Sequence, residues 1–277
     1  MVRPVVSLVV LCAFVAGAGA APTKHGKSRK AKKTQVRAKP KAKTSAVRAK
    51  SSDEAHITRP SDGDQSPAYH YNNLSQADCE AELTKRKVPF RRETASTGVR
   101  APVRLTGPLH GVVFRTDESD KARATSRYEI GDCRLILALD DFSEILASND
   151  IVEVRHYSMY RPPGKEWPEG KDATRHAGAL ALDAGRFIAK DGSVLNVDKH
   201  FNGALGAKTC GEGAGPKPVT AEATKLRGIV CAAVDKRIFN VVLTPNFNKP
   251  HHNHFHLEVT REPLVRGRGA ATKRYGR

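Results

Sequence analysis

The sequence lacks any long hydrophobic segment beyond its N-terminal region. That region contains an apolar run from Val5 to Ala16, and no later segment approaches the about 20 apolar residues that a transmembrane helix needs. The run follows Arg3 and leads into a stretch of Ala and Gly that ends at Ala21, which is typical of a cleaved export signal. We therefore expect residues 1–21 to be a signal peptide, and the mature chain to be periplasmic or extracellular, without a transmembrane segment.

Cysteines are few, and none of them forms a Cys-x-x-Cys pair, which argues against a zinc cluster built on thiolates. Cys12 lies in the apolar run and follows a leucine rather than the small residue of a lipoprotein signal, so we expect no lipid anchor. The remaining four cysteines are an even number, which fits disulfides in an oxidising compartment. We predict Cys79 with Cys133 and Cys210 with Cys231, so that each bridge closes a loop within one half of the domain; buried free thiols are the alternative.

Acidic residues are absent from residues 22–50, which contain twelve Lys or Arg, and residues 261–277 contain six basic residues against one Glu. Residues 51–260 hold 28 basic and 28 acidic residues, so the formal net charge of +18 comes from the two ends. The front segment has too few apolar residues to offset the entropy cost of ordering. We therefore expect residues 22–65 to be a disordered Lys/Ala/Pro-rich basic tail, followed at the other end by a basic C-terminal tail.

The charge of these tails indicates anionic partners. On an exported protein, a polycationic tail is expected to adhere to anionic wall polymers, lipid headgroups or extracellular nucleic acid, and a solvated spacer is the alternative. No nucleic-acid recognition module accompanies the tail, so we expect no specific nucleic-acid partner. We expect the chain to be a monomer.

Residues 66–260 have the composition of a globular domain, and about 195 residues are enough for one hydrophobic core. No internal repeat is evident. Helices and strands without regular repetition predict the α+β class. The expected helices cover residues 75–87, with Ser75 as the cap, 133–147 and 221–236, and the expected strands cover residues 103–105, 111–116, 151–157, 238–243 and 255–259.

The run from His251 to Val259 predicts a strand with several imidazoles on one face. Side chains alternate along a strand, which places His254, His256 and Glu258 on one face and three apolar residues on the other. The apolar face can pack on a core while the polar face presents imidazoles to a metal ion or a reacting group. Glu258 lies one pleat farther along, so it fits support of a ligand or a surface salt bridge better than ligation. The alternative for the whole run is a solvated face or an adventitious metal binder.

A second cluster, His176 followed seven positions later by Asp183, supplies another nitrogen and a carboxylate oxygen. With His256 these residues make a two-histidine, one-carboxylate zinc set, which leaves a position for water. Such a metal lowers the pKa of its water to about 7 and polarises the carbonyl under attack. The alternatives are that His176 is a satisfied core or loop histidine and that Asp183 caps the segment after it.

Three further residues are candidates for the chemistry. His254 is placed to take a proton from the water or to stabilise the developing oxyanion, and His251 is a second candidate for the same role. Arg161 follows a predicted strand, where a guanidinium can hold a substrate carboxylate or an oxyanion by a forked pair of hydrogen bonds; the alternative is a surface arginine in a Pro-rich turn. Three other histidines are expected to take no part: His156, which packs or points away, His200 and His252.

These two stretches, with the order and spacing of their residues, resemble the extensin-like C-terminal domain of bacteria. Through it they resemble the zinc peptidases grouped with D-alanyl-D-alanine carboxypeptidases, penicillin-insensitive murein endopeptidases, lysostaphin-type enzymes and the hedgehog signalling domain. That group carries a Ser-x-His-x-x-Gly-x-Ala-x-Asp element and then a His-x-His element. Here Thr174 stands at the Ser position and Ala179 at the Gly position. The resemblance spans roughly residues 78–260.

The resemblance implies a small α+β scaffold with a central antiparallel sheet and flanking helices. It implies that His256 is the zinc ligand and that His254 and His251 are the catalytic or transition-state histidines. It also implies that Tyr160 and Arg161 contact the substrate. Where some relatives carry a Glu-x-x-His pair, this chain has Asn at position 253, so a carboxylate base of that kind is not expected.

The substrate class that the resemblance implies is the peptide stem or cross-bridge of bacterial peptidoglycan. The sequence therefore predicts an exported zinc metallopeptidase acting as a carboxypeptidase or an endopeptidase. A non-catalytic wall-binding or scaffolding protein with the same fold is the alternative, and a secreted toxin that degrades competitors' walls would use the same chemistry.

Overall fold

The computed structural model describes residues 65–94 and 96–260. The predicted signal peptide and nearly all of the two predicted basic tails lie outside the described residues. Within this part of the chain, no helix is both long and apolar enough to span a membrane.

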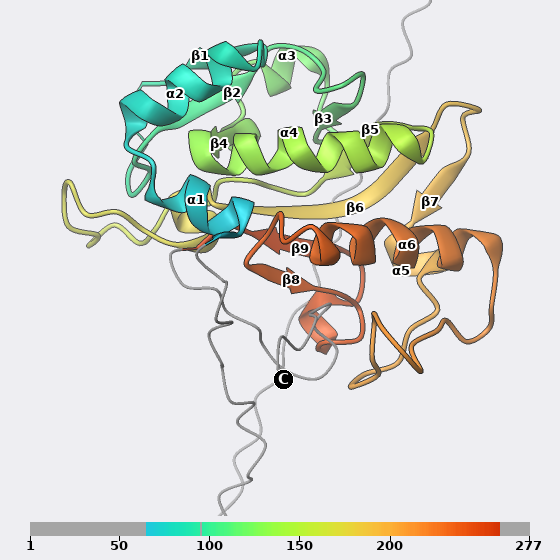
Figure 1. The fold of residues 1–277 in the computed structure, drawn as a ribbon. Coiled ribbons are helices and arrows are strands. Elements are labelled where there is room, and N and C mark those ends of the chain that lie inside the picture. Colours follow the sequence, from blue (N-terminus) through green and yellow to red (C-terminus); the bar gives the residue numbers. More distant parts are fainter. Residues whose placement is uncertain (1–64, 95, 261–277) are drawn as a thin grey trace, which may run out of the picture. The chain divides into compact units, whose positions relative to one another are not determined.

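Helices and strands alternate irregularly along the described chain (Figure 1). The α-helices are α1 (Pro67–Asn73), α2 (Gln76–Lys85), α3 (Asp120–Arg123), α4 (Cys133–Ser148), α5 (Val197–His200) and α6 (Ala221–Asp235). The strands are β1 (Phe90–Arg92), β2 (Pro102–Leu105), β3 (Val113–Arg115), β4 (Ile130–Asp132), β5 (Ile151–His156), β6 (Ala181–Ala189), β7 (Val194–Asn196), β8 (Val241–Leu243) and β9 (Phe255–Glu258). Short 3₁₀ turns are η2 (Arg127–Glu129), η3 (Arg175–Gly178) and η4 (Lys249–His251).

The three predicted helices are confirmed as α2, α4 and α6, to within two residues at each end. Ser75, Asp132 and Thr220 begin them, because each side chain accepts a hydrogen bond from a backbone N–H of the first turn. The predicted strands are confirmed as β2, β3, β5, β8 and β9, most of them shorter than expected. The α+β class is thus confirmed.

The larger sheet has the order β3-β5-β6-β9-β8, and β7 pairs with β6. Its pairs are antiparallel, as the resemblance implied, except β3 with β5, which is parallel. The expectation of an antiparallel sheet is wrong for this pair because the chain leaves β3, passes through β4 and α4, and returns to the same end, a crossover that makes strands parallel. A second sheet has the order β1-β2-β4.

The longest strand, β6, is one that the sequence analysis did not predict. It lies between β5 and β9 and contains Asp183, so the alternative that Asp183 caps a following segment is wrong. Four of its nine residues are Ala or Gly, which have low strand propensity. Pairing on both sides, which is a tertiary effect, stabilises the strand in spite of this composition.

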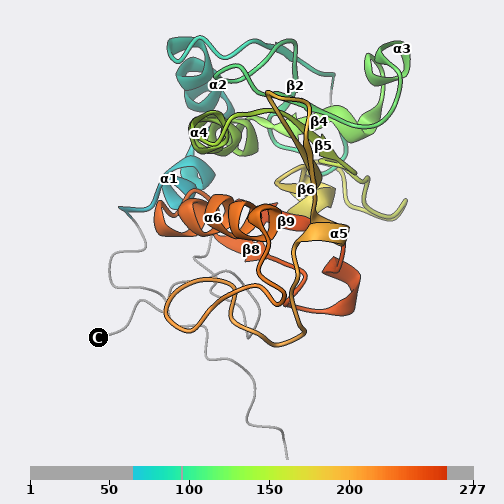
Figure 2. The same ribbon diagram turned by 90° about the vertical axis from the view of Figure 1, so that its right-hand side faces the viewer.

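Helices α4 and α6 lie on the same side of the larger sheet (Figure 2). Leu182, Phe255 and Leu257 are fully buried in one hydrophobic cluster with the apolar residues of these helices, and each such side chain stabilises the fold by about 1.5–3 kcal/mol. Asp183 and His256 alternate with these residues, so they belong to the opposite face of the sheet. The polar and apolar faces predicted for the C-terminal strand are confirmed.

Both predicted disulfides are present. Cys79–Cys133 joins α2 to the start of α4, and Cys210–Cys231 joins the loop before α6 to that helix. The alternative of buried free thiols is therefore wrong.

Candidate metal centre

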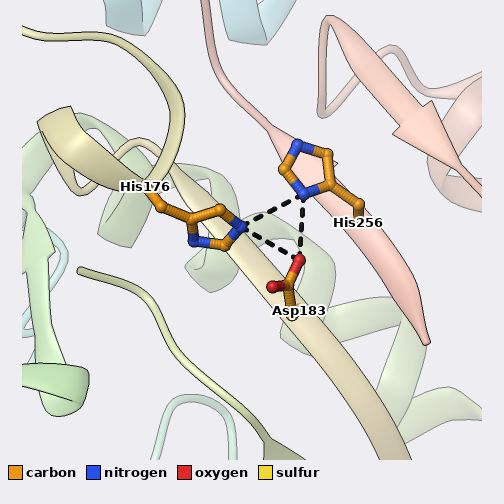
Figure 3. Close-up of side chains that lie close together, drawn as sticks. All are labelled: His176, Asp183 and His256. Atoms are coloured by element: carbon orange, nitrogen blue, oxygen red, sulfur yellow. Dashed lines mark hydrogen bonds and ion pairs between the residues drawn. The ribbon is translucent and has the colours of Figure 1, made fainter. Parts of the chain in front are cut away.

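His176, Asp183 and His256 converge on the sheet face opposite the helices (Figure 3). Asp183 Oδ1 lies 2.9 Å from His256 Nδ1 and 3.0 Å from His176 Nε2, and the two ring nitrogens are 3.3 Å apart. All three side chains are buried, and one ligand atom from each lies within 4.8 Å of the others. The group could therefore hold a metal ion, as the sequence analysis expected for these three residues.

Strand pairing and a tight turn bring the three side chains together. Asp183 and His256 are register partners in β6 and β9. His176 lies in η3, and this turn ends at Ala179, whose φ of 52° is in the left-handed region that glycine favours. Ala179 is the position at which the resembling motif carries Gly, so the backbone turn is retained without it.

The outer nitrogen of each candidate histidine has a hydrogen-bond partner. His176 Nδ1 donates to the carbonyl of Met159 at 3.1 Å, and His256 Nε2 lies 3.1 Å from Glu258 Oε2. Such outer partners orient a ligand histidine and direct its other nitrogen at the metal. Glu258 is placed to give such support to the candidate ligand His256, and it also lies 3.9 Å from Arg175.

The charge states fit a cation. Burial would raise the pKa of Asp183, but the imidazoles of His176, His254 and His256 outweigh it and hold that pKa far below its usual range. Burial lowers the pKa of His176, so its ring is neutral and its proton lies on Nδ1, facing the Met159 carbonyl. The unprotonated Nε2 then faces an ionised oxygen 3.0 Å away. A cation between the two atoms would stabilise this contact.

The pKa of His256 is shifted in the opposite direction to that of His176. Burial would lower the pKa of His256, but hydrogen bonds to Asp183 and Glu258 raise it. When the ring carries a proton on each nitrogen, it donates one hydrogen bond to each of the two carboxylates. Because a metal ligand must be deprotonated, metal binding at Nδ1 is expected to release that proton.

The two candidate catalytic histidines lie beside the triad of candidate ligands, His176, Asp183 and His256. His254 Nε2 is 3.3 Å from Asp183 Oδ1, and its Nδ1 is 2.8 Å from Asn253 Oδ1. The ring centroid of His251 lies 5.2 Å from that of His254 and 5.6 Å from that of His256. Burial, together with the neighbouring histidines, lowers the pKa of His251 to about 4, so its ring is neutral at neutral pH.

The His run is not a strand throughout, because only Phe255–Glu258 is extended. Asn248 caps a 3₁₀ turn here, accepting a hydrogen bond from the backbone N–H of His251. His251 Nδ1 also lies 2.6 Å from Asn248 Oδ1, so this side chain positions the ring as well. The turn brings His251 back over the strand that carries His256.

Arg161 lies at the rim of the centre rather than apart from it. Its Nη2 is 3.2 Å from Asp183 Oδ2, and its side chain is 55% exposed. Its backbone N–H donates to the carbonyl of His176 at 2.9 Å, which joins this turn to η3. Contact with substrate stays a prediction.

Sequence reasoning missed three residues beside the centre. Met159 contributes only its carbonyl, and Arg175 occupies a position that the resembling motif leaves open. Tyr157 packs edge-on against His254 with ring centroids 5.8 Å apart, and its ring covers Gly185, where a Cβ would lie 3.0 Å from the ring. None of these contacts has a signal in the sequence, because each depends on segments that meet only after folding.

The three histidines that were expected to take no part lie outside the centre: in the described part of the chain, no hydrogen bond or ion pair joins them to His176, Asp183 or His256. His156 is fully buried, and neither of its ring nitrogens has a hydrogen-bond partner there. His200 accepts a hydrogen bond from the backbone N–H of Asn196, and the exposed His252 lies 3.7 Å from Asp198.

The fold and the centre together define an α+β protein with a buried two-histidine, one-carboxylate group suited to a metal ion. The chain belongs to the family described as Extensin-like protein C-terminus, which matches residues 76–268. Comparison with curated proteins and with solved structures gave no match.

Proposed function

We propose that this protein is an exported, zinc-dependent peptidase that hydrolyses peptide bonds in peptidoglycan, as a carboxypeptidase or an endopeptidase. The observation that carries the proposal is the buried convergence of His176, Asp183 and His256, with the outer nitrogens of both histidines already engaged. The motif resemblance to the zinc peptidase and hedgehog group supplies the reaction and the substrate class.

The donor set is compatible with zinc, which is the metal that the motif resemblance implies. Imidazole nitrogens suit zinc and other transition metals, whereas magnesium and calcium prefer oxygen ligands. Zinc–ligand distances of about 2.0–2.2 Å place neighbouring ligand atoms of a tetrahedral site about 3.3–3.6 Å apart. The three atoms here are 2.9–3.3 Å apart, so a small adjustment is enough. Three protein ligands are also the usual number in catalytic zinc sites.

Bound zinc would supply an activated water and polarise the carbonyl of the bond to be cleaved. The chain's own residues must then move the proton. Asn253 holds Nδ1 of His254 and so directs Nε2 toward the centre. The pKa of His251, about 4, leaves its ring neutral at neutral pH with one unprotonated nitrogen, but it also makes the ring a weak base. The imidazoles take this role because Asn253 stands where some relatives carry a carboxylate base.

The predicted export and the substrate class fit each other. Two disulfides are consistent with an oxidising compartment outside the cytoplasm. The net charge of +18, which the chain's ends supply, favours adhesion to an anionic wall. The peptide substrate would thus be held near the domain by contacts that need no specific recognition.

Metal analysis and muropeptide analysis test the proposal together. The purified full-length mature chain should hold about one zinc, and His176→Ala or His256→Ala should release it, whereas the exposed His252→Ala should retain it. Mass spectrometry of peptidoglycan fragments should show new products with the wild type and none with His256→Ala. Metal content that neither ligand change affects would contradict the assignment.

A non-catalytic wall binder with the same fold is the second candidate. Asn253, at the position of a carboxylate base, together with the cationic ends, favours it. It predicts co-sedimentation with purified peptidoglycan without new amine ends, unchanged in His254→Ala.

A further inference from the structure

Two arginines from separate turns flank the candidate metal centre, and we name Arg161 and Arg175 the arginine pair. Arg161 Nη2 lies 3.2 Å from Asp183 Oδ2, and Arg175 Nε lies 3.9 Å from Glu258 Oε2. These two carboxylates contact the two different nitrogens of His256. The two guanidiniums therefore approach the same imidazole through its two acidic neighbours.

The backbone holds the arginine pair in place. The N–H of Arg161 donates to the carbonyl of His176 at 2.9 Å, directly beside Arg175. The carbonyl of Arg175 in turn accepts a hydrogen bond of 2.8 Å from the N–H of Leu180, just before β6. Both side chains thus start from anchored backbone at the edge of the buried triad.

The guanidinium groups themselves remain available. The side chains of Arg161 and Arg175 are 55% and 57% exposed. A guanidinium has five N–H donors. Among the described residues, Arg161 uses one donor on Asp183, and the contact of Arg175 with Glu258 is too long for a hydrogen bond. Most donors of the pair are therefore free to bind a ligand.

The charge balance of this region indicates an anionic ligand. The two positive charges of the arginine pair are matched by the two negative charges of Asp183 and Glu258. When the imidazoles are neutral, the formal charges of this region therefore sum to zero. A divalent ion in the triad would add two positive charges, and the region would then carry a net positive charge. A half-buried positive region attracts anions, and a pair of guanidiniums matches the planar, two-oxygen shape of a carboxylate.

We propose that Arg161 and Arg175 clamp a carboxylate of the substrate beside the bond to be cleaved, and that Arg175 thereby determines specificity. This inference rests on the proposed function and deepens it, because it names the substrate as a peptide with a free carboxylate near the scissile bond. An amidated peptide of the same sequence is a poor ligand. Lysine at position 175 replaces arginine poorly, because it cannot form the forked pair of bonds.

Binding without turnover tests the clamp. The full-length mature chain carrying His254→Ala is loaded with zinc and titrated calorimetrically with three acetylated peptides. One ends in D-Ala-D-Ala as the free acid, one is its C-terminal amide, and one is an amide that carries a D-Glu side-chain carboxylate. Preference for the first or the third over the plain amide shows whether a terminal or a side-chain carboxylate is bound.

We expect the preferred acid to bind about tenfold to a hundredfold more tightly than the plain amide, as for hydrogen bonds between charged groups. Arg175→Gln should abolish this preference, and Arg175→Lys should reduce it, with zinc content retained in both. The matched control is Arg91→Gln, whose side chain is 51% exposed, pairs with Glu93 and belongs to the smaller sheet. Equal binding of acids and amide by the parent protein would overturn the clamp.

The clamp and the proposed function can fail separately. If the parent protein prefers the acid through Arg175 but the otherwise wild-type chain cleaves no peptidoglycan, the clamp stands and the peptidase proposal fails. If that chain cleaves peptidoglycan and Arg175→Gln keeps the same preference between acid and amide, the clamp is refuted and the peptidase proposal stands.

Discussion

Asp183 and His256 face each other across β6 and β9, and the carboxylate Oδ1 lies 2.9 Å from the ring Nδ1. Strand register sets this relationship. A slip of one residue in either strand would turn one of the two side chains to the other face of the sheet. The sheet therefore fixes the positions of two of the three candidate ligands, which suits a site that must hold its ligand atoms in place.

Asp183→Asn tests the negative charge of the carboxylate in the candidate metal centre. The amide keeps the size of the side chain but removes the negative charge that faces three imidazoles, so metal affinity should fall by more than the about 10–100-fold that loss of an outer partner causes. Zinc competition titration measures the change, with Asp198→Asn as a control that lies outside the triad. Unaltered affinity would rule out Asp183 as a ligand.

Glu258→Gln tests the support of His256. The glutamate contacts His256 Nε2 at 3.1 Å, so its loss should weaken zinc binding by about 10–100-fold while the protein stays folded. The same titration measures this change, and Glu222→Gln at the exposed start of α6 is the control. If both variants bind zinc like the wild type, Glu258 does not support the ligand.

His156 predicts a pH dependence of stability. Burial lowers its pKa to about 4, whereas in an unfolded chain the value is about 6.5. Between these values the unfolded chain takes up a proton that the folded chain does not. The free energy of unfolding therefore falls as pH falls through this window, by about 2 kcal/mol between pH 7 and pH 5.

His156→Phe should remove this contribution, because phenylalanine does not titrate. Urea unfolding of both proteins at pH 7 and pH 5, with chelator present, measures it. The stability of the variant relative to the wild type should increase by about 2 kcal/mol at the lower pH. A difference that is the same at both pH values would show that His156 is not buried in its neutral form.

The Cys210–Cys231 disulfide anchors the loop that packs against the turn leading to His251. Asn246, in that turn, accepts a hydrogen bond of 2.8 Å from the backbone N–H of Ala204 in the loop. The double variant Cys210→Ser, Cys231→Ser should lose about 3 kcal/mol of stability, because a short closed loop no longer restricts the unfolded chain. Chemical denaturation of the non-reduced proteins measures the loss, and a change below about 0.5 kcal/mol would contradict it.

Local signals in the sequence predicted much of the scaffold. The cap at Ser75 and the apolar periodicity of the three long helices each depend on residues within a single segment. The alternation of His254, His256 and Glu258 does so too. The even number of cysteines, and the expectation that each bridge closes a loop within one half of the domain, led to the correct disulfides. The three candidate ligands came from spacing and motif resemblance, and the structure brings them together.

Only the tertiary structure decided the rest. Strand β6, rich in Ala and Gly, exists because β5 and β9 pair with it, and β3 became parallel to β5 because α4 returns the chain to the same end. The carbonyl of Met159 and the side chain of Arg175 reach the centre through turns for which the sequence carries no signal. The physical reason is range: capping and alternation depend on neighbours along the chain, whereas register, crossovers and the partners of a ligand depend on segments that meet in space.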